Sequence, residues 1–249
     1  VRGGMGALTQ AIAASARQNG AKIRTRADVV RISVHAGQAS GVVLKGGEQI
    51  RAATVMSGVD PRTTLLRLLG TKYLATDFVR AVRNIKYRGS AARVHLALRR
   101  LPRFVALPDS DAETYLRGAV QIAPTMDYIQ RAFDHAKYGE FSPHPYLDMR
   151  FPTVSDASLA PESCHLMSVT VKYARYQLRY ADWQAQKEAL GDAVLDTLAQ
   201  YAPNVRGSVQ HMQVLTPSDM EMSYGLSEGD PNHGEMTLDQ VFHMRPVPG

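Results

Sequence analysis

The first twenty residues combine a glycine-rich opening with hydrophobic positions at helical spacing. The pattern predicts a helix from about Ala7 that ends at Gly20 and buries one apolar face. Glycines lack a Cβ and adopt positive φ readily, so the opening allows the backbone to lie close to a ligand at a helix N-terminus. The glycines concerned are Gly3, Gly4 and Gly6, and the predicted buried face consists of Leu8, Ala11, Ile12 and Ala16.

Short alternating runs separated by turn residues follow this helix and predict a β-meander. Glycine-containing turns are expected at 36–38 and 45–48. A last short strand leads into the loop 58–61. The expected strands are 21–25, 29–34, 41–44, 49–52 and 54–57.

Beyond residue 60 helical and strand patterns alternate. Asp60 predicts an N-cap, and Pro61 fits the first turn of a helix that ends at Gly70. Asp182 predicts the cap of a long helix to about Tyr201. The fold class predicted is α+β, with a mixed, mostly antiparallel sheet flanked by helices. Further helices are expected over 74–84 and 126–138, strands over 92–98, 115–122, 146–151, 167–173 and 209–215, a loop over 156–163, and an irregular tail from 216.

Composition places the chain among globular proteins. The 249 residues are 45% hydrophobic and 21% charged, which excludes disordered and fibrous classes. The uncharged apolar runs are shorter than the roughly 20 residues that a bilayer span needs. Cys164 is the only cysteine, so no intramolecular disulfide can form, which fits a reducing compartment and predicts a cytoplasmic location.

Charge is distributed unevenly around a net value of +6. Eight basic residues occur between positions 80 and 103 without an acidic residue among them. The charged residues from 216 on are mainly acidic, so the two stretches are candidates to face each other. A solvated basic face is the first interpretation, and contact with an anionic membrane surface is the second. Nucleic acid is disfavoured because only Tyr87 and Phe104 lie nearby as stacking aromatics. The basic residues are Arg80, Arg83, Lys86, Arg88, Arg93, Arg99, Arg100 and Arg103.

No motif for metal or nucleophilic chemistry is present. The eight histidines are scattered without metal-ligand spacing, and no nucleophile elbow occurs. Cys164 and His165 are adjacent at the start of a predicted strand, so their side chains point to opposite faces and do not form a nucleophile pair. We therefore expect no catalytic side chain and no metal. Ten methionines suit an adaptable apolar pocket, although most fit an ordinary core.

The run GGMGALTQAIAASARQNGAKIRTRADVVRI, followed by SGVVLKGGEQIRAATVMSGVDP, resembles FAD-dependent oxidoreductases of the phytoene desaturase and carotenoid isomerase type, within the flavin amine oxidase superfamily. The resemblance covers residues 2–61 and returns in Asp239 to Phe242 with Arg245-Pro246. It implies an α/β parent fold and FAD as cofactor. The residues that it places near FAD are Gly3, Gly4, Gly6, Val29 and Ser57.

The same resemblance implies a division of the chain and a function. Residues 1–61 match part of an FAD-binding domain, 62–215 a substrate-binding domain, and 216–249 a segment that returns to the FAD domain. The implied activity is desaturation, dehydrogenation or isomerisation of an apolar or lipid-like small molecule. A non-catalytic binding domain of the same fold and a membrane-surface module remain alternatives. The candidate substrate contacts are Tyr173, Tyr176, Phe242 and Arg245.

Two elements of that family are absent from the sequence. The dinucleotide fingerprint that opens the family's proteins and the glycine-rich flavin segment that follows the Arg-Pro motif do not occur. We therefore expect an internal fragment that binds FAD weakly or not at all when isolated. A nicotinamide fingerprint built on Gly4, Gly6 and Asp28 is disfavoured because Thr9 replaces its third glycine and no strand precedes it.

Overall fold

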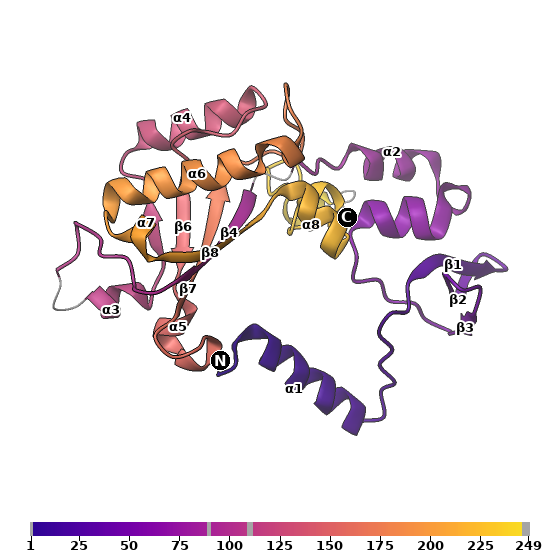
Figure 1. Cartoon of the computed structure of the whole chain (residues 1–249). Helices are drawn as coiled ribbons and strands as arrows, with labels where there is room; N and C mark the ends of the chain where they lie inside the picture. Colours follow the sequence, from indigo (N-terminus) through magenta and orange to yellow (C-terminus); the bar gives the residue numbers. More distant parts are fainter. Residues whose placement is uncertain (1, 89–90, 109–111, 246–249) are drawn as a thin grey trace. The chain divides into compact units, whose positions relative to one another are not determined.

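The computed structural model describes residues 2–88, 91–108 and 112–245 (Figure 1). The described residues form two compact units. The first unit lies within 1–21 and 90–219, and the second lies within 22–89 and 220–249. This division follows compactness, and the functional division into 1–61, 62–215 and 216–249 stays a prediction.

The first unit is built on a five-stranded sheet with the order β5-β6-β7-β4-β8. Each pair of neighbouring strands is antiparallel. This sheet and its helices confirm the predicted α+β class. The strands are β4 (Ala91–Leu98), β5 (Val120–Ile122), β6 (Leu147–Arg150), β7 (His165–Lys172) and β8 (Val209–Leu215).

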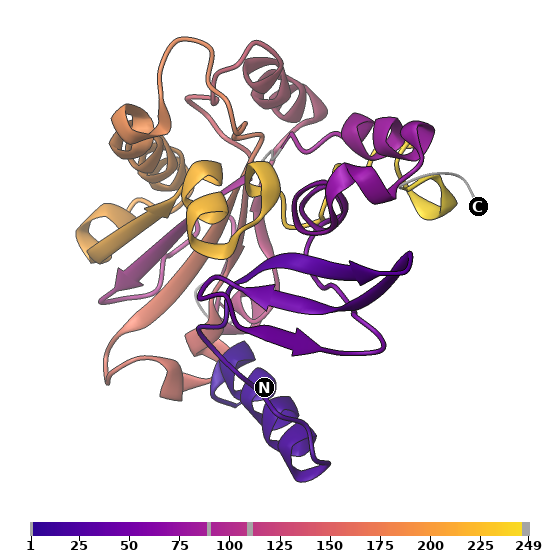
Figure 2. The same ribbon diagram turned by 90° about the vertical axis from the view of Figure 1, so that its right-hand side faces the viewer.

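Strict alternation of burial along β4 and β7 creates the core of the first unit. Every second side chain is buried, and this face packs with α6 (Trp183–Tyr201), which Figures 1 and 2 show along one side of the sheet. Gly191 allows α6 to approach β8, because a Cβ there would lie 2.7 Å from Met212 Cε. Burial of each Leu or Val contributes about 1.5–3 kcal/mol. The central core residues are Val94, Leu96, Met167, Val169, Leu190, Val194 and Leu198.

Capping residues define two helices of the first unit, and the sequence predicts the first of these caps. Asp182 accepts a hydrogen bond from the backbone N–H of Ala185 at the start of α6, over 2.8 Å. Thr125 caps α4 (Met126–Lys137) through the N–H of Tyr128. The expected strand over 115–122 is wrong in its first half, where α3 (Ala112–Leu116) occurs instead. The expected loop 156–163 contains a short 3₁₀ helix, η3 (Ala157–Leu159), and α5 (Pro152–Ser155) and α7 (Val205–Ser208) complete the unit.

Helix α1 (Gly4–Gln18) forms where the sequence predicts it, but it does not bury its apolar stripe. None of its described residues is buried, and the side chain of Ile12 is 61% exposed. The expected buried face over Leu8, Ala11, Ile12 and Ala16 is therefore wrong for this chain. The spacing of apolar residues predicts an apolar stripe on a helix, but it does not indicate whether another element covers that stripe.

The second unit contains a three-stranded antiparallel sheet in the order β1-β2-β3 (Figure 2). Its strands are β1 (Val29–His35), β2 (Gln38–Leu44) and β3 (Gln49–Arg51), which confirms the predicted meander. The expected strands 21–25 and 54–57 are wrong, since neither segment has strand structure. A strand needs a neighbouring strand for its backbone hydrogen bonds, and the described residues provide none to these two segments.

Helices and the C-terminal segment complete the second unit. The helix predicted after Asp60 is η1 (Arg62–Gly70), which has π-helical hydrogen bonding, and η2 (Thr71–Tyr73) and α2 (Thr76–Asn84) follow it. Val82, Ile85 and Tyr87 form a small core. The expected irregular tail contains α8 (Pro217–Tyr224), whose first three residues belong to the first unit, and η4 (Ser227–Gly229) and η5 (Phe242–Met244) in the second. Within the part of the chain that the structure describes, no helix has the length and apolar character needed to cross a bilayer.

Candidate functional site

The glycine-rich opening forms a left-handed turn at the N-terminus of α1. Gly3 has φ +80° and Gly4 has φ +74°, a region in which residues with a Cβ are strained. A Cβ on Gly4 would lie 3.2 Å from Leu159 Cδ2, whereas a Cβ on Gly6 would meet nothing within 4 Å. The backbone therefore requires glycine at the first two positions and not at the third.

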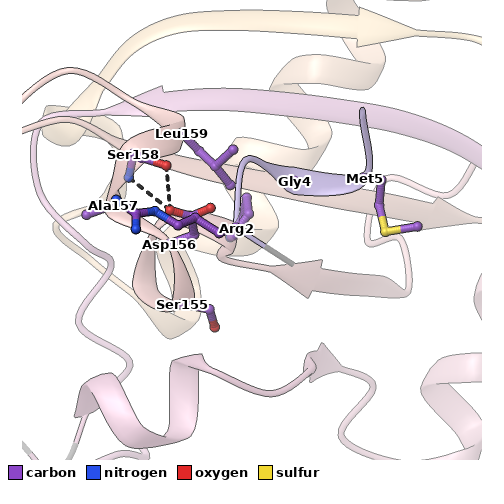
Figure 3. A pocket seen from close by; sticks show the side chains of 9 residues that line it. Arg2, Gly4, Met5, Ser155, Asp156, Ala157, Ser158 and Leu159 are labelled. Carbon is purple, nitrogen blue, oxygen red and sulfur yellow. Dashed lines mark hydrogen bonds between the residues drawn. The ribbon is translucent and has the colours of Figure 1, made fainter. Parts of the chain in front are cut away.

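Asp156 accepts the hydrogen bond that this turn offers. The N–H of Gly3 donates to Asp156 Oδ2 over 2.6 Å. Ser158 donates to Oδ1 through its N–H and its hydroxyl, over 3.2 Å and 2.6 Å (Figure 3). The bonds from Ser158, then the bond from Gly3 and the charge of Arg2, hold the pKa of Asp156 below its ordinary value. A carboxylate is favourable at a helix N-terminus, so Asp156 stabilises this end of α1.

An open cavity of about 650 Å³ lies beside the turn in the first unit. Its volume falls in the range of small-molecule sites. The Gly3 amide already donates to Asp156, and backbone conformation explains Gly3 and Gly4 without a ligand. A contact of Gly3, Gly4 or Gly6 with FAD therefore stays a prediction. The cavity is lined by Arg2, Gly4, Met5, Pro152 and residues 155–159, and Figure 3 shows the Arg2 and Asp156 side chains on the same side of it.

Val29 and Ser57, the other two predicted FAD contacts, belong to the second unit. Val29 begins β1 opposite Leu44 and is exposed. The Ser57 hydroxyl lies 2.7 Å from the hydroxyl of Thr64 in η1. Their role toward FAD also stays a prediction.

Tyr173 and Tyr176 lie just after β7 in the first unit. Tyr173 has φ +64°, and its ring contacts Phe133 and Tyr146, with centroid distances of 5.4 Å and 6.3 Å. Burial, and then the nearby Tyr146, raise the pKa of Tyr173. The carbonyl oxygen of Tyr176 accepts a hydrogen bond from Trp183 Nε1 over 2.9 Å. The structure thus brings Tyr173 into a half-buried aromatic cluster, which suits an apolar ligand.

Phe242 and Arg245 lie in the second unit and differ in environment. The Phe242 side chain is 92% exposed. The guanidinium of Arg245 donates to five backbone carbonyl oxygens at 2.9–3.2 Å. These bonds hold the C-terminal loop together and give Arg245 a structural role that sequence reasoning missed. The five carbonyls belong to Asn232, His233, Gly234, Glu235 and Gln240.

Sequence reasoning identified Asp60 only as a helix cap, and the structure adds a distant partner. Its carboxylate is buried and accepts from the N–H of Thr63 over 3.0 Å and from the hydroxyl of Ser227 over 2.9 Å. Beside it, the guanidinium of Arg62 lies 4.3 Å from the centroid of the Tyr87 ring and pairs with Glu228. Burial raises the pKa of Tyr87 to about 12. The Asp-Pro motif indicated the cap, but no local signal indicates Ser227.

The basic stretch and the acidic tail face each other in the second unit, as the charge pattern suggests. Lys86 pairs with Asp239 at 2.9 Å, and Arg88 pairs with Glu235 at 2.6 Å. The basic run is divided between the two units, because Arg80 to Arg88 belong to the second unit and Arg93 to Arg103 to the first. Membrane contact therefore stays a prediction for each part separately.

A second cavity in the first unit is mainly apolar. It has a volume of about 420 Å³ and lies beside β5, the edge strand of the sheet. Such a lining accepts a hydrocarbon group rather than a charged one. Its apolar side chains are Phe104, Val105, Leu107, Tyr115, Val120, Ile122, Pro124 and Tyr201.

Comparison with known proteins gives this geometry a context. Residues 1–215 match the family described as flavin containing amine oxidoreductase. The chain is 35% identical to a rat protein, pyridine nucleotide-disulfide oxidoreductase domain-containing protein 2, over 100% of its own length and 44% of that protein. It is 26% identical to the zeta-carotene-forming phytoene desaturase of Myxococcus xanthus, covering 98% of this chain and 44% of that one.

Two further similarities are weaker in sequence. Prolycopene isomerase 2, chloroplastic, of an Oncidium hybrid cultivar is 24% identical over 86% of this chain and 34% of that protein. The crystal structure of an oxidoreductase from Methanosarcina mazei shares the fold, with a TM-score of 0.60, 18% identity, and coverage of 86% of this chain and 43% of that chain. The chain therefore spans less than half the length of these proteins.

Proposed function

Because this chain belongs to the family of flavin-containing amine oxidoreductases, we propose that it is the substrate-binding portion of an FAD-dependent oxidoreductase. The proposed substrate is an apolar or lipid-like molecule that is desaturated, dehydrogenated or isomerised. The flavin supplies the redox chemistry in such an enzyme. The residues of this chain bind and orient the substrate and exclude water from it.

The observation that carries the proposal is the apolar cavity beside β5, taken together with the family membership. The cavity belongs to the unit that holds the antiparallel sheet, where its aromatic and aliphatic lining favours a hydrocarbon group. The aromatic cluster of the exposed Phe133 with the half-buried Tyr146 and Tyr173 adds a second aromatic surface to the same unit. The relatives whose names state a carotenoid desaturase or isomerase activity support an apolar substrate.

The glycine turn is the proposed point of approach to FAD. Gly4 lines a cavity of about 650 Å³, and as a glycine it has no Cβ to occupy that space. Asp156 holds the turn in its left-handed form through the Gly3 amide. In this proposal Asp156 is a positioning residue that keeps α1 aligned, and it takes no part in the chemistry.

The complete gene product tests the proposal. We expect it to show flavin absorption bands, and we expect phytoene in detergent micelles to bleach those bands under anaerobic conditions. Since an isomerase turns over without net bleaching, prolycopene conversion is followed by chromatography in parallel. Absence of flavin bands would contradict the proposal and favour a non-catalytic binding domain.

A pair of variants tests the cavity itself. Tyr115 lines the apolar cavity and is half-exposed, so Tyr115→Asp should lower turnover at least tenfold while the flavin bands stay unchanged. Tyr138→Asp, on an exposed tyrosine after α4, is the matched control and should retain activity. Equal effects of the two substitutions would remove the cavity from the proposal.

Flotation with anionic liposomes at low and high salt distinguishes the membrane-surface alternative from the proposed function.

A further inference from the structure

The face of the five-stranded sheet opposite α6 carries two rows of polar side chains. Because side chains alternate along a strand, the residues between the buried core positions point to this face. Strand pairing aligns them across the sheet. One row is Gln121, Asp148, Thr170 and Arg93 and ends at the apolar Leu215, and the next is Arg150, Ser168, His95 and Gln213.

The middle of these rows is not an ordinary solvated sheet face. The side chains of Arg93, Asp148 and Thr170 belong to residues that are half-buried rather than exposed. Asp148 Oδ1 is shielded from solvent and has no hydrogen-bond donor among the described residues. A shielded acceptor without a donor costs roughly 1–3 kcal/mol, so the position favours a ligand that donates to it.

The guanidinium of Arg93 supplies the complementary charge. It donates to the Thr170 hydroxyl and therefore lies over β7, between its own strand and that of Asp148. Among the described ion pairs none includes Arg93, Arg150 or Asp148. The two rows hold two arginines and one carboxylate, which leaves a positive charge available to an anion.

His95 adds a neutral polar group to the next row. Burial, and then the charge of Arg93, lower the pKa of His95, so its imidazole is uncharged at neutral pH. The groups that face it across the sheet are Ser168 and Gln213, which are neutral as well. Lys172 is a further cation on this face of β7, two residues after Thr170, and Arg93 is the cation that lies over Thr170 in the middle of the two rows.

We propose that this face binds a small organic carboxylate that carries a hydroxyl group near the carboxylate. Its anion pairs with Arg93, and its hydroxyl donates to Asp148 Oδ1. Adjacent strands are about 5 Å apart, so the guanidinium over β7 and the carboxylate on β6 match a hydroxyl on the second or third carbon. The inference goes beyond the proposed function, because a hydroxycarboxylate differs from the apolar substrate proposed there, and its binding requires no flavin.

The test uses the 249-residue chain and three probes in isothermal titration calorimetry. The probes are 3-hydroxyoctanoate, octanoate and octanol, which share a similar alkyl chain and differ in the anion and the hydroxyl. We expect the affinity order 3-hydroxyoctanoate, octanoate, octanol. Arg93→Gln should weaken both carboxylates at least tenfold and leave octanol unchanged, because an ionic hydrogen bond is lost.

Three further variants make the result specific. Arg93→Lys keeps the charge and should bind octanoate more tightly than Arg93→Gln does. Arg100→Gln removes an exposed arginine just after β4 and should leave all three affinities unchanged. Asp148→Ala should abolish the preference for 3-hydroxyoctanoate over octanoate. Circular dichroism checks the fold of each variant, and the probe series on the unaltered chain decides the charge preference independently of them.

The inference is overturned if neither carboxylate binds more tightly than octanol, or if Arg93→Gln and Arg100→Gln have the same effect. An unchanged preference for the hydroxyl in Asp148→Ala would also overturn the assigned role of Asp148. These outcomes are independent of the redox proposal. Flavin bands without carboxylate binding would refute only this inference, whereas carboxylate binding without flavin bands would refute only the proposed function.

Discussion

The carboxylate of Asp60 accepts a hydrogen bond from the hydroxyl of Ser227, which lies 167 positions later in the chain. Asp60 is only 3% exposed, and its other oxygen receives the N–H of Thr63 at the start of η1. One side chain thus joins the beginning of a helix to the C-terminal segment within the second unit.

Replacement of Asp60 by alanine should destabilise the second unit by about 2 kcal/mol, because it removes a cap and leaves the Ser227 hydroxyl without its acceptor. Urea unfolding followed by circular dichroism measures the loss. Asp28 is an exposed aspartate of the same unit, and Asp28→Ala should change the free energy of unfolding by less than about 0.5 kcal/mol. Equal losses in the two variants would show that the buried connection contributes nothing.

Acid should weaken the same unit through Asp239. The nearby Thr237 side chain and then Lys86, whose Nζ lies 2.9 Å from Asp239 Oδ2, lower the pKa of Asp239 to about 2. Its pKa in the folded chain lies below the unfolded value, so its contribution to stability is present above the ordinary aspartate pKa and is lost as pH falls toward about 2. Asp239→Asn should therefore flatten the acid side of the stability profile. An unchanged profile in this variant contradicts the assignment.

Gly41 should tolerate no side chain. Its φ is +145°, and a Cβ would lie 2.1 Å from the backbone oxygen of Ile50, which cannot move without disrupting the pairing of β2 with β3. Gly41→Ala should lower the midpoint of thermal unfolding by several degrees, since strain of this kind costs roughly 1–3 kcal/mol. Gly46→Ala, where a Cβ meets nothing within 4 Å, is the matched control and should leave the midpoint nearly unchanged.

Removal of the Arg245 guanidinium should loosen residues 232–240. Arg245→Met keeps much of the side-chain length but removes every donor to the five carbonyl oxygens. We expect faster proteolysis in this loop, mapped by mass spectrometry. Arg80→Met, on an exposed arginine of α2 that pairs with Asp77, serves as the control and should not change the cleavage pattern. A loop equally resistant in Arg245→Met would rule out the structural role and leave substrate contact as its explanation.

The parts of the fold that depend on local pattern could be predicted from the sequence. The alternation of apolar and polar residues predicted β4 and β7, and the residue types predicted the helix caps at Asp60 and Asp182. The failures occur where the outcome depends on distant neighbours. Residues 21–25 and 54–57 have the composition of strands but lack partners, and the apolar stripe of α1 is uncovered.

The candidate sites show the same limit. The glycine pattern indicated a left-handed turn, but the partner of that turn is Asp156, which lies 153 positions from Gly3. The sequence predicts Arg245 as a substrate contact, but its hydrogen bonds to backbone carbonyls could not be inferred from residue types. The pairing of Arg93 with Thr170 depends on strand register, which the alternation of each strand alone does not specify.

The second unit consists of two segments that are far apart in the sequence, and this affects how the chain folds during synthesis. Asp60, Lys86 and Arg88 leave the ribosome well before Ser227, Asp239 and Glu235, and the whole sheet of the first unit is translated between them. The earlier residues therefore lack these partners in the nascent chain while the residues of the intervening sheet are translated. Residues 227–239 therefore complete the second unit, and a ribosome that stalls before them would release a chain in which Asp60, Lys86 and Arg88 lack these partners.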